Sequence, residues 1–158
     1  MKKGNSIFEG CTSLKNIELD MWVGDSTVTS TAIITSSPIV NYIFRGCTSL
    51  TDISKINIKE VYISSNSVHF DGGNQIGVKG LFENCTSLEV AQLTGISDAL
   101  KTGSNIFKGC SNLKEVRGHI VSAKNQFNLP SLQRITNFSC EDATNIATGC
   151  TNLTSFNG

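Results

Sequence analysis

Six cysteines and two histidines are the side chains best suited to act as nucleophiles, redox groups or soft metal ligands in this chain. A structural zinc site needs about four such ligands close together, whereas the sequence has no Cys-x-x-Cys pair and no Cys/His cluster. His69 and His119 are 50 residues apart, which favours a solvated or hydrogen-bonded histidine over a ligand or a base. The sequence therefore predicts no metal site.

Five of the six cysteines occupy one position of a repeated motif, each preceded by Gly or Asn and followed by Thr or Ser; they are Cys11, Cys47, Cys85, Cys110 and Cys150. Free cysteine behaves as a small apolar side chain and is among the most buried residue types. The spacing thus favours a ladder of buried free thiols over a disulfide framework. Cys140 lies outside this register and is the candidate for a reactive thiol.

The acidic residues form no recognisable metal-binding or catalytic motif either. The segment 71–74 (Asp-Gly-Gly-Asn) lacks the further carboxylates of a calcium loop and is typical of a tight turn. Glu141 and Asp142 are adjacent, not set at the separation that glycoside hydrolysis requires. The sequence has no phosphate loop, no Gly-x-Ser-x-Gly and no His-Glu-x-x-His. We therefore expect a protein that is not an enzyme and has no cofactor.

Composition narrows the class of partner. The chain has 158 residues, with 13 Lys and Arg against 13 Asp and Glu, so its net charge is zero. That balance removes the usual electrostatic reason to expect nucleic acid or an anionic membrane as a partner. No apolar run approaches the length of a membrane span, and polar residues follow the first three, so the sequence predicts neither membrane insertion nor a signal peptide.

The elements that position these side chains come from a repeat that reads Ile/Leu-Phe-x-Gly/Asn-Cys-Thr/Ser-x-Leu. Its copies begin at residues 7, 43, 81, 106 and 146, the last with Ala147 in place of Phe. Gly and Asn tolerate the left-handed backbone that closes a helical turn, so each copy predicts a single short turn of helix. After the motif leucine, apolar residues alternate, as in 14–19, which predicts a short strand.

The motif leucines are separated unevenly, by 36, 38, 25 and 40 residues. Residues 129–135 match the motif in degenerate form, and segments 31–35 and 67–70 fall near the midpoints of two other gaps. Either these segments are weak repeat units, or the long gaps hold β-hairpin insertions at 27–35 and 61–70; both alternatives stay open. Because one unit cannot bury its apolar face alone, the repeat predicts a β-rich solenoid, an irregular right-handed stack of coils with short helical turns that occupies residues 1–158 as one domain.

The repeat resembles the BspA-like leucine-rich repeats, whose units read Ala/Ile-Phe-x-x-Cys-x-x-Leu-x-x-Ile-x-Ile. Residues 8–14 and 44–50, both Phe-x-Gly-Cys-Thr-Ser-Leu, carry the resemblance, and the long spacings and the missing Ile-Pro after most strands depart from it. The resemblance implies an irregular leucine-rich-repeat fold used for adhesion or protein binding at the bacterial cell surface or outside the cell. Similar repeats occur in protozoan surface proteins and in proteins of phages.

A polar stripe between the apolar anchors is the candidate binding face. It comprises Lys15, Asn16, Glu18, Thr51, Asp52, Ser54, Glu89, Gln92, Lys114, Glu115, Arg117, Gln133, Arg134 and Thr136. Such a ladder suits many weak contacts with a protein or glycan ligand, although a solvated face accounts for it equally well. Arg117 and Arg134 are its two strongest anchor residues.

Neither end of the chain carries an amphipathic capping element. Uncapped repeats expose apolar faces and strand edges, so we expect either a fragment of a longer repeat array or ends covered by self-association or a partner. Two functions follow as hypotheses. The first is a non-catalytic protein-binding or adhesion module of a cell-surface leucine-rich-repeat protein, and the alternative is a structural or self-assembly component of a phage or surface layer.

Overall fold

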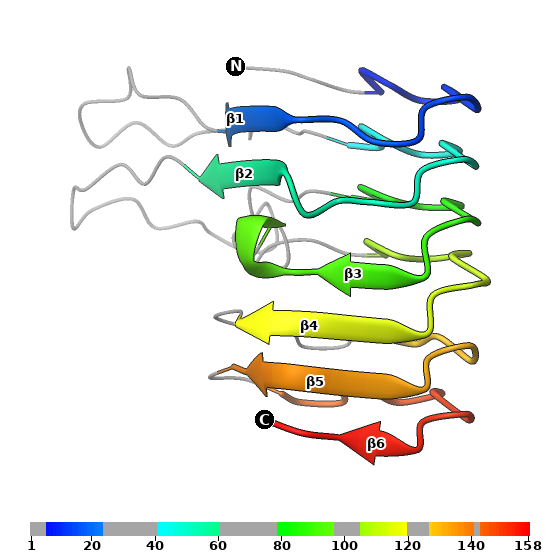
Figure 1. Cartoon of the computed structure of the whole chain (residues 1–158), viewed down its shortest axis with the longest axis vertical. Coiled ribbons are helices and arrows are strands. Elements are labelled where there is room, and N and C mark those ends of the chain that lie inside the picture. The colour runs from blue at the N-terminus through cyan, green and yellow to red at the C-terminus, as the bar shows by residue number, and fades with distance from the viewer. Residues whose placement is uncertain (1–5, 24–40, 61–78, 97–104, 120–126, 141–142) are drawn as a thin grey trace, which may run out of the picture.

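Six strands and one short helix make up the regular structure of the residues that the computed structural model describes, which are 6–23, 41–60, 79–96, 105–119, 127–140 and 143–158. The elements are β1 (Leu19–Val23), β2 (Ile56–Glu60), β3 (Val90–Gln92), the 3-10 helix η1 (Thr94–Ile96), β4 (Glu115–His119), β5 (Arg134–Ser139) and β6 (Ser155–Phe156). All strand pairs are parallel, and they form two sheets, β1-β2 and β3-β4-β5-β6 (Figure 1).

The predicted solenoid, an irregular right-handed leucine-rich-repeat coil stack with short helical turns, is wrong. The described strands form two small parallel sheets, of two and four strands, instead of one continuous sheet. Helix is nearly absent from the described residues, since η1 has three residues and the motif segments are hydrogen-bonded turns. Parallel strands with crossover connections in small sheets give a small α/β-like domain.

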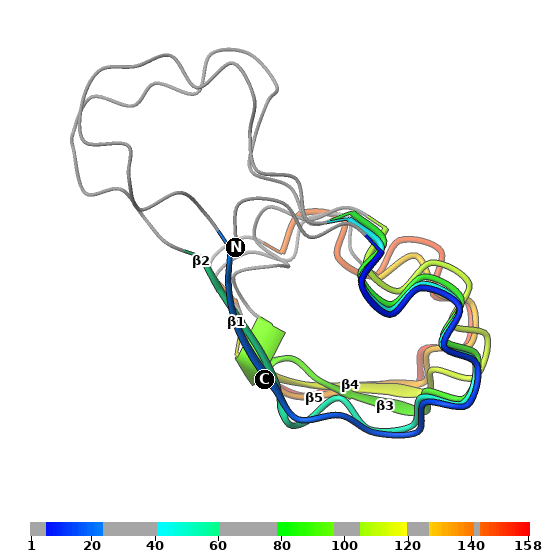
Figure 2. The same cartoon turned by 90° about the horizontal axis from the view of Figure 1, so that it is seen from above.

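The sheet divides because the strands begin at different distances from the motif leucines. A turn between Ile53 and Ile56 follows Leu50 and delays β2. The Asp52 carboxylate, just before this turn, accepts a hydrogen bond from the Ser54 N–H at 2.8 Å. In contrast, β3 begins directly after Glu89 and is soon followed by η1. As a result, β2 packs against η1. In the view from above, β1 and β2 overlie each other and run at an angle to β3, β4 and β5 (Figure 2).

The motif turns pair with one another on the far side of the core. The backbone N–H groups of Phe8, Phe44 and Phe82 donate to carbonyl groups of the following motif copy at 2.8, 2.9 and 2.8 Å. As the sequence predicts, the residue before each motif cysteine has a left-handed backbone, with φ of 73° at Gly10 and 62° at Asn84. The Gly/Asn position therefore closes a turn, but it ends no helix.

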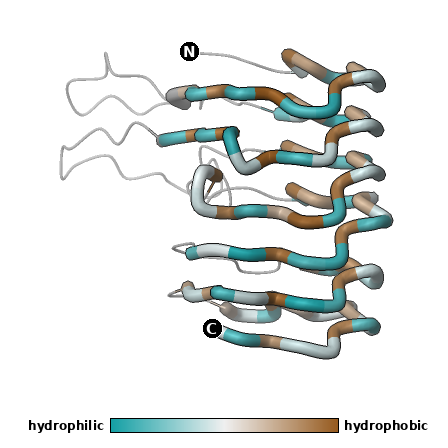
Figure 3. The backbone as a smooth tube through the Cα atoms, viewed as in Figure 1, coloured by the Kyte–Doolittle hydropathy of each residue, from teal (hydrophilic) through white to brown (hydrophobic). Residues whose placement is uncertain are grey.

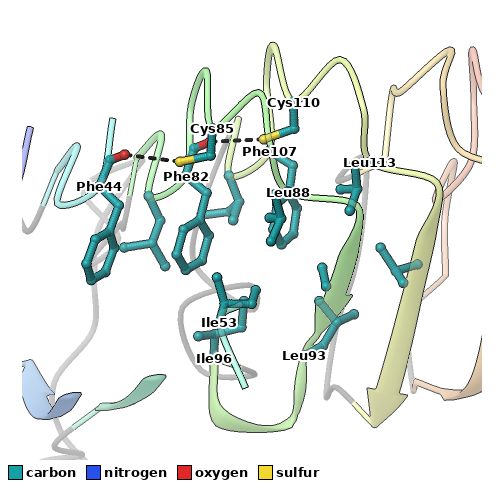
Figure 4. Close-up of a cluster of buried hydrophobic side chains, with 14 of the residues drawn as sticks. Phe44, Ile53, Phe82, Cys85, Leu88, Leu93, Ile96, Phe107, Cys110 and Leu113 are labelled. Carbon is teal, nitrogen blue, oxygen red and sulfur yellow. Dashed lines mark hydrogen bonds between the residues drawn. The ribbon is translucent and has the colours of Figure 1, made fainter. Parts of the chain in front are cut away.

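Phenylalanine rings and cysteine thiols fill the core beneath these turns (Figure 4). The rings of Phe8, Phe44, Phe82 and Phe107 stack with centroid separations of 5.3, 5.4 and 5.6 Å. Along the strands, hydrophobic and hydrophilic residues alternate (Figure 3), and the inward hydrophobic residues Ala91, Val116 and Ile135 are buried on the other side of the core. The core is continuous from Met21 to Ile146.

The predicted thiol ladder is present in its central part. Cys47, Cys85 and Cys110 are buried, and their Sγ atoms donate to phenylalanine carbonyl oxygens of the preceding copy at 3.0, 3.1 and 3.0 Å. Burial raises the pKa of the Cys110 thiol to about 12 and also raises the pKa of the Cys85 thiol. At one end of the ladder Cys11 is exposed.

Several sequence predictions lie outside the described residues. They are the segments 31–35 and 67–70 with the alternative hairpins at 27–35 and 61–70, His69, the turn at 71–74, and the acidic pair 141–142. The strand expected after the degenerate motif at 129–135 is present as β5, between β4 and β6.

Candidate binding face

The outward positions of β3, β4 and β5 form three rows across the four-stranded sheet. The strand register aligns Val90 with Glu115 and Arg134, then Gln92 with Arg117 and Thr136, and finally His119 with Ser139. Between these rows Ala91, Val116 and Ile135 point inward and are buried. We call the outward set Gln92, Glu115, Arg117, His119, Arg134, Thr136 and Ser139 the polar face.

A β-bulge sets the third row. The register between β4 and β5 shifts after Arg117, and Asn137, with φ of 48°, is the extra residue on β5. The shift returns Phe138 to the core, where it is 3% exposed. It also places Ser139 opposite His119, with 2.7 Å between the serine Oγ and the histidine Nδ1.

Glu115 organises the centre of the polar face. It is the only polar or charged residue in the described part of the chain that is buried, at 4% exposure. Arg117 donates to its carboxylate from Nε at 2.7 Å and Nη2 at 3.1 Å, Arg134 donates from Nη2 at 2.9 Å, and the Thr136 hydroxyl donates at 2.7 Å. The hydrogen bonds from Arg117, Thr136 and Arg134 outweigh burial and lower the pKa of Glu115 to about 2.

Eight of the fourteen predicted site residues lie together on or beside this sheet: Glu89, Gln92, Lys114, Glu115, Arg117, Gln133, Arg134 and Thr136. The Lys114 ammonium is 3.2 Å from a Glu89 carboxylate oxygen at the start of the strands. Gln92 donates to the Thr94 hydroxyl at 3.0 Å. Most of the eight are exposed, whereas Glu115 is buried by its own partners.

The other six predicted residues lie in the segments that precede β1 and β2, the strands of the other sheet, and not on the polar face: Lys15, Asn16, Glu18, Thr51, Asp52 and Ser54. All six are exposed. Thr51 donates to the Lys15 carbonyl at 3.2 Å, and Glu18 lies 3.7 Å from Lys55, so these contacts join neighbouring segments. These six residues lie beside the two-stranded sheet.

Sequence reasoning missed His119 and Ser139. Alternation of side chains along the strand, continued from Arg117, predicts that His119 also faces outward. It does not predict Ser139, because the β-bulge that aligns Ser139 with His119 cannot be recognised from the alternating pattern. On the motif turns the reasoning also missed Arg45, whose Nε donates to Glu9 at 2.7 Å and whose guanidinium lies 4.0 Å from the ring centre of Tyr42.

Protonation of Glu115 is expected to destabilise the protein. The folded-state pKa near 2 lies below the ordinary value of 4.5, so the stabilisation is complete above pH 4.5 and disappears as the pH falls through the folded-state pKa. Glu115→Gln should therefore lower the free energy of unfolding at pH 7 by about 2 kcal/mol, a value reduced because the two arginines are half-exposed. Urea unfolding as a function of pH measures both effects.

Glu89→Gln is the matched control for that prediction, since the Glu89 carboxylate pairs with Lys114 while 62% of the side chain remains exposed. We expect the free energy of unfolding of Glu89→Gln to differ little from that of the unaltered chain, both at pH 7 and at acid pH. A loss at pH 7 as large in Glu89→Gln as in Glu115→Gln would contradict the special role of the buried carboxylate.

The described residues offer no other site of recognisable chemistry. No group of three or more His, Cys, Asp or Glu side chains among them is placed to hold a metal ion, and Cys140 is half-buried and forms no disulfide. Within the same residues there is no helix of the length and apolar character needed to cross a bilayer. No protein-family model matches the chain, and neither the curated proteins nor the solved structures give a match.

Proposed function

We propose that this protein is a non-catalytic binding or adhesion module that recognises a protein or glycan partner through the polar face. The observation that carries the proposal is the pair of arginines held on one buried carboxylate, Arg117 and Arg134 on Glu115. The motif's resemblance to BspA-like repeats supports adhesion and a location at the cell surface or outside the cell.

Fixed side chains make a polar face a better binding surface than a merely solvated one. Binding must overcome the entropy lost when long side chains become ordered, and pre-ordered side chains reduce that cost. Arg117 and Arg134 are already tied to Glu115, while His119 and Ser139 are tied to each other. Arginine is also enriched among the residues that dominate binding energy at interfaces.

A matched pair of lysine variants tests the proposal. Lys114 and Lys108 are exposed, and each lies near a glutamate of the preceding motif copy, at 3.2 and 3.8 Å. Lys114 flanks the polar face, whereas Lys108 lies on a motif turn. The labelled chain and its variants would be applied to arrays of glycans and of purified extracellular proteins. We expect Lys114→Ala to weaken the strongest array signals several-fold and Lys108→Ala to leave them unchanged. Equal effects of the two variants, or no array binding, would contradict the proposal.

A second candidate function is a structural component that assembles with itself through its ends, as a phage or surface-layer protein would. Phe156 in β6 is 54% exposed and Ile7 on the first described turn is 41% exposed, so both ends of the described chain present apolar surface. Sedimentation velocity over a concentration series should then show oligomers that Phe156→Asp disrupts. A monomer at all concentrations would exclude this function.

A further inference from the structure

The centre of the polar face has an unbalanced positive charge. Among the residues that the structure describes, Arg117 and Arg134 share the single carboxylate of Glu115, which leaves one positive charge in excess. The neighbouring Lys114 lies against Glu89 and adds no further excess. In a chain whose net charge is zero, this gives the polar face a local affinity for anions.

The two guanidinium groups retain donors for a ligand. A guanidinium carries five N–H bonds, and the hydrogen bonds to Glu115 use only the Nε and Nη2 atoms of Arg117 and Arg134. Half of each side chain remains exposed, 47% for Arg117 and 50% for Arg134. Because Glu115 fixes both groups, their remaining donors are pre-ordered for a planar anion such as a carboxylate.

Residues around the arginines match the other groups of a peptide. Val90, at 37% exposure, lies in the same row as Glu115 and Arg134 and offers an apolar contact. Gln92 lies beside Arg117, and the His119–Ser139 pair completes the face with groups that can bond peptide amides. Carboxylate, amide and apolar contacts together describe an acidic peptide segment.

We propose that the polar face binds an acidic peptide segment of a partner protein, with one of its carboxylates held between Arg117 and Arg134. This inference rests on the proposed binding function and adds the chemistry of the partner. The carboxylate of the ligand takes the outer donors of both guanidinium groups, while Glu115 keeps the inner ones. Binding should therefore weaken as salt rises, because part of the attraction is between charges accessible to solvent.

Fluorescence polarisation with labelled hexaglutamate and hexaglutamine tests the proposal on the full chain. We expect hexaglutamate to bind about tenfold more tightly than hexaglutamine, and Arg117→Gln and Arg134→Gln each to remove most of that difference. Arg117→Lys keeps the charge but not the planar fork, so it should give an intermediate loss. Arg45→Gln is the control, since Arg45 pairs with Glu9 on a motif turn, and it should bind hexaglutamate as the unaltered chain does.

Three results would overturn the inference. The first is equal affinity for hexaglutamate and hexaglutamine, and the second is a loss of hexaglutamate binding in Arg45→Gln as large as in Arg117→Gln or Arg134→Gln. The third is a sulfated oligosaccharide that binds more tightly than hexaglutamate through Arg117 and Arg134. Circular dichroism of each variant separates lost binding from lost folding. If hexaglutamate fails while Lys114→Ala still weakens the array signals, the chemistry of the partner is wrong and the binding function stands. If both fail, the binding function itself is wrong.

Discussion

Phe82→Ala is expected to lower the free energy of unfolding by about 3 to 5 kcal/mol, the range found for truncated buried aromatic residues. The Phe82 ring is fully buried and lies between the rings of Phe44 and Phe107, at centroid separations of 5.4 and 5.6 Å. Its removal leaves a cavity in the middle of the core and breaks two ring contacts. Equilibrium unfolding in urea, followed by circular dichroism, measures the loss.

Phe156→Ala is the control for that prediction. Phe156 belongs to the same series of ring contacts, 5.9 Å from Phe138, but it is 54% exposed. Because its truncation removes little buried area and creates no enclosed cavity, we expect a loss of about 1 kcal/mol or less. If the two variants lost equal stability, burial of the stacked rings would not be what holds the motif turns together.

Gly95→Ala is expected to destabilise the protein by about 3 kcal/mol, at the upper end of the range for overpacking. A Cβ atom on Gly95 would lie 2.2 Å from the carbonyl oxygen of Ile56 and 2.8 Å from Oδ1 of Asn57. A backbone oxygen cannot move aside as a flexible side chain can, so η1 and β2 must separate. Hydrogen exchange should show that β1 and β2 lose protection while β4 and β5 keep theirs.

Gly10→Ala separates this clash from ordinary backbone strain. Gly10 has φ of 73°, which alanine adopts poorly, but a Cβ atom there would have no neighbour within 4 Å. The cost should be about 1 kcal/mol and should arise from the backbone alone. A stability loss in Gly95→Ala no larger than in Gly10→Ala would mean that the close approach of η1 and β2 contributes little to the fold.

Charged side chains link neighbouring motif copies in a consistent direction. In the pairs Glu18–Lys55, Asp20–Lys59, Glu83–Lys108 and Glu89–Lys114 the acidic residue belongs to the earlier segment and the basic residue to the later one. Where both side chains are exposed, as in Glu18–Lys55, the pair contributes little stability by itself. Glu115 differs from these acidic residues because its carboxylate is buried and accepts hydrogen bonds from three side chains. These hydrogen bonds hold the arginines at the centre of the polar face in place.

Local patterns in the sequence predicted the parts of the site that depend on one strand. Alternation after Leu113 placed Glu115 and Arg117 outward and Val116 inward, because successive side chains of a strand point to opposite sides. Alternation could not predict that Glu115 is buried. That burial comes from Arg134 and Thr136 on β5, and it depends on how the two strands align.

The sequence by itself determined the motif turns: Gly or Asn at the left-handed position, a phenylalanine and a cysteine directed into the core, and a polar set directed outward. These features follow from the backbone preference of single residues and from local periodicity. Only the tertiary structure decided where each strand begins, how the sheet divides at η1 and where the bulge at Asn137 lies. Strand pairing joins residues distant in sequence, and a shift of one residue leaves the local pattern unchanged while it alters every contact across the sheet.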